Sequence, residues 1–149
     1  MIWVSRLRIP FIIQSLIFLI LVYIYIVGNN LAAGIQWIFF RYQQSYFGDS
    51  IIVFYKDLFY VQAGLLKGRS AVAAEFEFVA TIIMILAFFL FLAAYLLKTG
   101  TWIRAAAMGV MSGGFLYLLS DVIQYGIFFH GPAGFVIPVG VPVTLVTEW

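Results

Sequence analysis

The sequence contains no cysteine, only one histidine, and few charges, since 9% of its 149 residues are Asp, Glu, Lys or Arg. Without cysteine the chain forms no disulfide, no thiolate metal site and no iron–sulfur cluster. A soluble domain usually has about 25% charged residues. This chain therefore has too little polar surface for a water-soluble globule. Its net charge of +2 comes from scattered basic residues and does not indicate nucleic acid as a partner.

Hydrophobic residues make up 65% of the chain, and aromatic residues make up 19%, with 16 Phe and 9 Tyr. This composition is typical of an integral membrane protein. We predict an all-α polytopic membrane protein with three, or alternatively four, transmembrane helices, with interfacial helices and an extended β-like C-terminal arm. The predicted membrane domain is 1–130, and the predicted arm is 131–149.

Three apolar stretches are long enough to cross a bilayer, which takes about 20 residues. They cover about 10–28, 72–97 and 102–129. The first is longer than the roughly 7–15 apolar residues of a signal peptide, which predicts a retained span. The link 98–101 is so short that the second and third spans should be antiparallel neighbours.

The segment 31–66 is apolar on average, but charged residues interrupt it. Ile35, Ile38 and Tyr42 follow helical spacing and predict an amphipathic helix in the membrane interface. Residues 51–66 form either a second interfacial helix or a re-entrant dip. The alternative is a fourth span, which would place Lys56 and Asp57 near its middle and would require both to be paired inside a complex.

Small residues recur at every fourth position of the third predicted span, at Ala105, Gly109 and Gly113. They lie on one helical face, and the two glycines form a GxxxG pattern that lets membrane helices approach closely. The partner of this face is either the neighbouring helix of the same hairpin or a helix of another subunit. The pattern alone does not decide between them.

Three acidic residues lie close to predicted membrane ends. Glu75 and Glu77 are in the first two turns of the second span, and Asp121 is near the end of the third. An antiparallel hairpin places all three in the same leaflet. Residues two apart point to different sides of a helix, so at most one of the glutamates should meet Asp121. One hypothesis is a proton or cation pathway, or an acid beside a quinone. The other is pairing with a basic residue of another subunit or with lipid headgroups.

The single histidine, His130, follows the third span. One histidine without cysteine cannot supply an ordinary metal site. A site built from Glu77, Asp121 and His130 is the geometric alternative to a histidine that contacts free helix-end carbonyls and headgroups at the membrane surface. We expect no metal and no cofactor held by this chain alone, and lipid or quinone at its interfaces with other subunits.

The C-terminal stretch FVIPVGVPVTLV resembles the opening strand of a cupredoxin domain, such as the one in oxidase subunit II. The matching residues are Phe135, Ile137, Pro138, Gly140, Pro142 and Val143. The resemblance implies an outward strand on a membrane anchor like those of respiratory oxidases. It implies no copper site, because the chain has no cysteine and no histidine after this stretch. The residues that follow, up to Trp149, are also too few for a β-sandwich.

We expect a non-catalytic small accessory subunit of a larger integral membrane complex, respiratory or otherwise redox-active, whose partners are other membrane subunits and lipids. The alternative is a small homo-oligomeric transporter or ion-conducting protein that uses Glu77 and Asp121. An enzyme ranks last, because the sequence has no P-loop, nucleophile elbow, GxGxxG or HExxH motif. The basic residues are balanced, with four on each side of the membrane in the three-span arrangement. Because the first span often sets the orientation, we expect a plasma-membrane protein with a cytoplasmic N-terminus and the arm outside.

Overall fold

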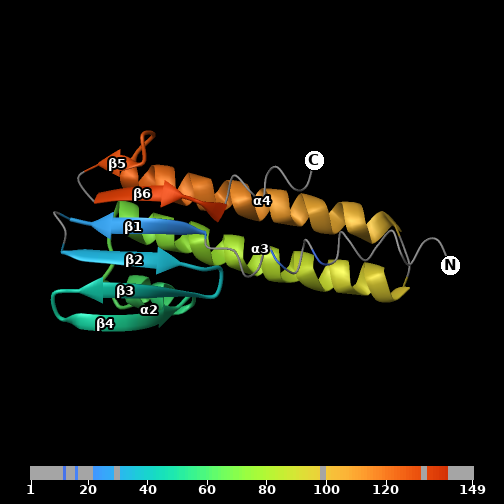
Figure 1. Ribbon diagram of the computed structural model, residues 1–149, viewed down its shortest axis with the longest axis horizontal. Helices are drawn as coiled ribbons and strands as arrows, with labels where there is room; N and C mark the ends of the chain where they lie inside the picture. The colour runs from blue at the N-terminus through green and yellow to red at the C-terminus, as the bar shows by residue number, and fades with distance from the viewer. Residues whose placement is uncertain are drawn as a thin grey trace.

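The computed structural model describes residues 12, 16, 22–28, 31–97, 100–131 and 134–140. Figure 1 shows two long helices side by side, with a sheet along one end of the pair. The elements are β1 (Tyr23–Val27), β2 (Ala32–Gln36), β3 (Phe40–Ser45), β4 (Gly48–Val53), α2 (Lys56–Gln62), α3 (Arg69–Leu97), α4 (Gly100–Tyr125), β5 (His130–Gly131) and β6 (Gly134–Pro138).

The six strands form one antiparallel sheet in the order β4-β3-β2-β1-β6-β5. Strand β1 is central: it pairs with β2 across a short turn, and with β6 after the chain has passed through both long helices. Tyr25 lies opposite Gly34 in β2 and Val136 in β6. A side chain at Gly34 would collide with the ring of Tyr25. Glycine at this position therefore lets the Tyr25 ring lie across the neighbouring strand.

Helices α3 and α4 form a close-packed antiparallel hairpin. The buried residues of α3 include Ala80, Met84 and Ala87, which recur every three or four positions. A Cβ atom at Gly109 would lie 2.8 Å from Ala87 Cβ, and one at Gly113 would lie 2.6 Å from Met84 Cγ. The small-residue face of α4 thus packs inside the chain's own hairpin. Ala106 belongs to this face and is fully buried, whereas Ala105 is exposed.

The inner face of the sheet covers the half of the hairpin that contains the start of α3 and the end of α4 (Figure 1). Tyr23 and Tyr25, two residues apart in β1, both point inward and are buried. Phe54 stacks on Phe78 of α3 with ring centroids 5.7 Å apart. The core joins sheet and hairpin and consists of Val22, Tyr23, Tyr25, Ile38, Ala80, Met84, Ala87, Val110, Tyr117, Tyr125 and Val136.

The prediction of an all-α fold with three or four spans is wrong. Residues 32–36, 40–45 and 48–53 are strands of a meander, in place of the interfacial helix and the following dip or span. Residues 23–27 at the end of the first predicted span form β1. Positions 12 and 16 of that span are helical, and the rest of 10–21 lies outside the described residues.

Two of the described helices, Arg69–Leu97 and Thr101–Tyr125, are long and apolar enough to cross a membrane. They occupy the second and third predicted spans, although α4 ends at Tyr125 and not at residue 129. The start of the predicted arm is not extended away from the molecule. Residues 134–138 form β6 within the chain's own sheet, and 141–149 lie outside the described part of the chain.

Candidate functional site

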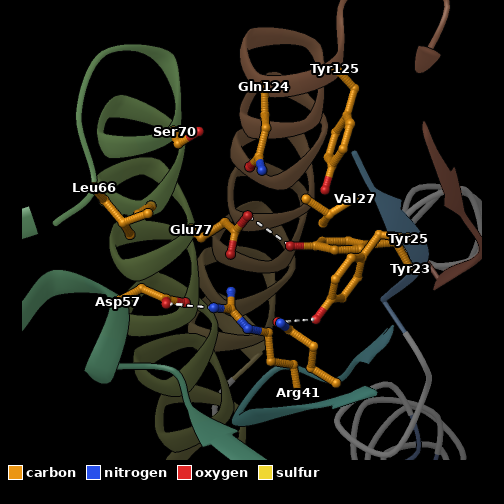
Figure 2. Close-up of a pocket in the computed structure, with 12 residues that line it drawn as sticks. Tyr23, Tyr25, Val27, Arg41, Asp57, Leu66, Ser70, Glu77, Gln124 and Tyr125 are labelled. Carbon is orange, nitrogen blue, oxygen red and sulfur yellow. Dashed lines mark hydrogen bonds and ion pairs between the residues drawn. The ribbon is translucent and has the colours of Figure 1, made fainter. Parts of the chain in front are cut away.

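A cavity of about 280 Å³ lies between the inner face of the sheet and the hairpin (Figure 2). Strands β1 and β3, helix α2 and both long helices contribute to its wall. Most of its side chains are polar or aromatic, in a chain that is otherwise strongly apolar. It is lined by Tyr23, Tyr25, Val27, Arg41, Gln43, Asp57, Leu66, Ser70, Ala74, Glu77, Gln124 and Tyr125.

Glu77 is the acidic residue that α3 contributes to the cavity. The Tyr23 hydroxyl donates a 2.7 Å hydrogen bond to Glu77 Oε1, and the Ser120 hydroxyl of α4 donates one of 3.1 Å to the same oxygen. Glu77 therefore connects the sheet to both helices. In Figure 2 its other oxygen points away from Tyr23, into the space toward Arg41.

Arg41 and Asp57 form the only ion pair among the described residues, with 2.7 Å between Arg41 Nη2 and Asp57 Oδ1. Alternation along β3 turns Arg41 inward, and Asp57 lies in the first turn of α2. Burial raises the pKa of Asp57, and the adjacent guanidinium offsets only part of that rise. Arg41 Nε is buried and has no hydrogen-bond partner within the described residues. The cavity wall therefore retains one unused N–H donor.

The two tyrosines of β1 stay protonated at neutral pH. Burial raises the pKa of Tyr25 to about 12, despite the opposing effect of Arg41. Burial, and after it the carboxylate of Glu77, raises the pKa of Tyr23 well above its usual value. The Tyr25 hydroxyl donates to Gln43 Oε1 at 3.2 Å. Both hydroxyl protons are thus used within the wall, and the oxygen lone pairs remain as acceptors.

Asp121 lies one residue after Ser120, the α4 residue that bonds Glu77. It is 1% exposed, and neither carboxylate oxygen has a hydrogen-bond partner among the described residues. Glu77 and Asp121 both lie close enough to Tyr23 to act on it electrostatically. The hairpin therefore brings Glu77 and Asp121 to the same region, whereas Glu75 is exposed on a different side of α3.

His130 is exposed in the short edge strand β5 and does not line the cavity. It borders a separate, open hollow together with Arg69 and the end of α4. No group of three or more His, Cys, Asp or Glu side chains in the described part of the chain could hold a metal ion. The structure thus gives no support to the alternative metal site of Glu77, Asp121 and His130.

Sequence reasoning missed four of the residues that shape this cavity: Tyr23, Tyr25, Arg41 and Asp57. Arg41 and Asp57 carried a usable signal, since opposite charges in an apolar stretch are expected to pair. The tyrosines carried none, because they lie in a stretch interpreted as a membrane span.

Comparisons of the chain with known proteins give no independent indication of its function. No family model, no curated protein and no solved structure matches it. The function of this chain is therefore inferred from its own residues and their geometry.

Proposed function

We propose that this protein is a non-catalytic subunit of a larger integral membrane complex, anchored by α3 and α4. The observation that carries the proposal is the exposure of large apolar side chains outside these two helices. In the β3–β4 turn, Tyr46 is 89% exposed and Phe47 is 97% exposed. In the loop after α4, Ile127 is 78% exposed and Phe128 is 90% exposed. Exposed apolar groups of this size typically mark surfaces that bind protein or membrane.

These side chains belong to the end of the molecule opposite the α3–α4 link (Figure 1). A helix of 29 residues such as α3 is about 43 Å long, which exceeds a hydrocarbon core of about 30 Å. The uncharged part of α3, residues 78–97, has the length of one span, and its charged residues Arg69, Glu75 and Glu77 precede it. Lipid around 78–97 leaves the far end of the sheet outside the hydrocarbon. The aromatic turn residues there are suited to another subunit.

The finer features of the proposal come from the sequence. The C-terminal resemblance supports a respiratory or other redox complex, with lipid or quinone at its subunit interfaces. The proposed location is the plasma membrane, and Arg6 and Arg8 support a cytoplasmic N-terminus. Strands β1 and β6 are hydrogen-bonded neighbours, so these two strands lie on the same side of the membrane.

The subunit proposal predicts that the chain co-purifies with larger membrane subunits in mild detergent at fixed stoichiometry. Alanine at both Tyr46 and Phe47 should reduce their recovery about tenfold or more, because truncating two central contacts removes more than about 1.4 kcal/mol. Phe89→Ala is the matched control, since Phe89 is exposed on the uncharged part of α3. Quantitative mass spectrometry measures the recovery. A chain recovered alone, or a double variant with undiminished partners, contradicts the proposal.

A second candidate, proton or ion conduction, is favoured by one observation. Asp121 is buried without a partner among the described residues, beside Glu77, which reaches a polar cavity. Acids placed in this way are typical of ion and proton pathways in membranes. Glu77 and Asp121 are the residues that would act in relay.

Conduction predicts that Asp121→Asn abolishes flux into proteoliposomes, whereas Glu75→Gln leaves it unchanged. The amide keeps the shape of the side chain but cannot give up a proton or carry charge. Dye-reported acidification measures the flux. An Asp121→Asn protein that conducts like the wild type eliminates this candidate, and wild-type liposomes without flux favour the subunit role.

A further inference from the structure

The charge balance of the cavity is negative. One guanidinium, that of Arg41, faces two lining carboxylates, and its hydrogen-bonded partner is Asp57. Glu77 is left with hydrogen bonds from neutral hydroxyl groups only, and a third acid, Asp121, lies nearby outside the cavity lining. Partly buried carboxylates are compensated by a cation or by protonation, because an isolated buried charge is strongly unfavourable. The cavity therefore favours a ligand with positive charge.

The hydrogen-bonding groups of the cavity show what kind of cation fits. Both bonds that Glu77 accepts from described residues end on Oε1, which leaves Oε2 free to accept. The hydroxyl groups of Tyr23 and Tyr25 donate hydrogen bonds to Glu77 and Gln43, and their oxygen lone pairs can also accept. Several acceptors around one space match a group with several N–H donors. A primary ammonium has three of them, and a quaternary ammonium has none.

One donor accompanies these acceptors. Arg41 Nε is buried without a partner in the described part of the chain, and Arg41 lines the same cavity. An oxygen atom near the ammonium of the ligand would satisfy this N–H group. A volume of about 280 Å³ holds roughly nine water molecules at about 30 Å³ each. That space accommodates a ligand of a few heavy atoms with some water.

We propose that this cavity binds a primary ammonium group that carries an oxygen atom three bonds away, as in a small amino alcohol. The ammonium lies against Glu77 and the tyrosine oxygens, and the oxygen accepts from Arg41. The same chemistry comes from a free amine or from the ethanolamine headgroup of a lipid. This inference depends on neither proposed function.

The test is calorimetric titration of the full-length protein in detergent with ethanolamine and with choline. Choline keeps the charge and the hydroxyl group but has no N–H donor. We expect ethanolamine to bind saturably with a Kd of about 1 mM or tighter, and choline to bind about tenfold more weakly or worse, because the hydrogen bonds to a charged group are lost. The lipid source is tested with vesicles that contain phosphatidylethanolamine, compared with phosphatidylcholine vesicles. Selective competition by the former identifies a headgroup, and its absence identifies a free amine.

Glu77→Gln should weaken ethanolamine binding about tenfold or more, since it removes the charge but keeps the shape. Glu75→Gln is the control, because it makes the same change two residues away, at an exposed position outside the cavity. Tyr25→Phe, which removes one acceptor oxygen, should weaken binding severalfold and decides the matter if Glu77→Gln does not fold. The proposal is overturned if the wild type shows no saturable heat, if choline binds equally well, or if the folded variants bind like the wild type.

Discussion

Replacement of Asp57 with alanine is expected to destabilise the fold by about 3–5 kcal/mol, because it leaves Arg41 buried without its counter-charge. The Arg41 side chain is 21% exposed and the Asp57 side chain 8%, so water can replace little of the lost interaction. The pair also joins β3 to α2 through a 2.7 Å bond. Thermal unfolding in detergent, followed by circular dichroism, should show a clearly lower Tm.

A double variant separates the loss of a partner from the loss of packing. Arg41→Met together with Asp57→Leu removes both charges and keeps apolar volume, so it should recover most of the stability lost in Asp57→Ala. If Asp57→Ala unfolds at the wild-type temperature, the ion pair does not stabilise the junction of sheet and helices. If the double variant is as unstable as the single one, shape and not charge dominates.

Replacement of Gly113 with leucine should strongly disrupt the packing of the hairpin. A Cβ atom there would lie 2.6 Å from Met84 Cγ and 3.3 Å from the carbonyl oxygen of Ala80. The flexible Met84 side chain can move, but the backbone of α3 cannot move without separating the helices. Overpacking of this kind destabilises by about 1–3 kcal/mol, and the rigid carbonyl favours the upper end. Thermal unfolding in detergent measures the effect.

The control for this change is Ser112→Leu, one residue earlier and on the exposed side of α4. It adds a similar side chain to the same helix without entering the contact with α3. Equal unfolding temperatures for the two variants would show that the glycine face is not a packing surface. A change in complex size with unchanged stability of the isolated chain would instead assign the face to another subunit.

The sequence predicted the two long helices because each is a stretch of apolar residues long enough to cross a bilayer. The short link between them makes them antiparallel, and this constraint alone places Glu77 and Asp121 at the same end. The sequence also predicted that Glu75 and Glu77 lie on different sides of α3, since residues two apart in a helix point in different directions. These inferences succeed because helical geometry is local and repeats every few residues.

The segment before α3 was interpreted wrongly for a physical reason. Ile35, Ile38 and Tyr42 fit a helical period, yet most of 32–53 forms three strands of a sheet. Strand preference depends on cross-strand neighbours more than on the residue itself. Strand β1 also pairs with β6, which places Tyr23 opposite Pro138, far along the chain. No local pattern contains that contact.

By itself, the sequence determined the two long apolar helices and placed Glu77 and Asp121 at the same end of them, because both follow from local composition and helical geometry. The tertiary structure alone decided that strand residues such as Tyr23 and Arg41 meet Asp57 and Glu77 around one polar cavity. That meeting depends on strand register and on packing of the sheet against the hairpin. Both are set by contacts between residues distant in the chain, which periodicity within one segment cannot reveal.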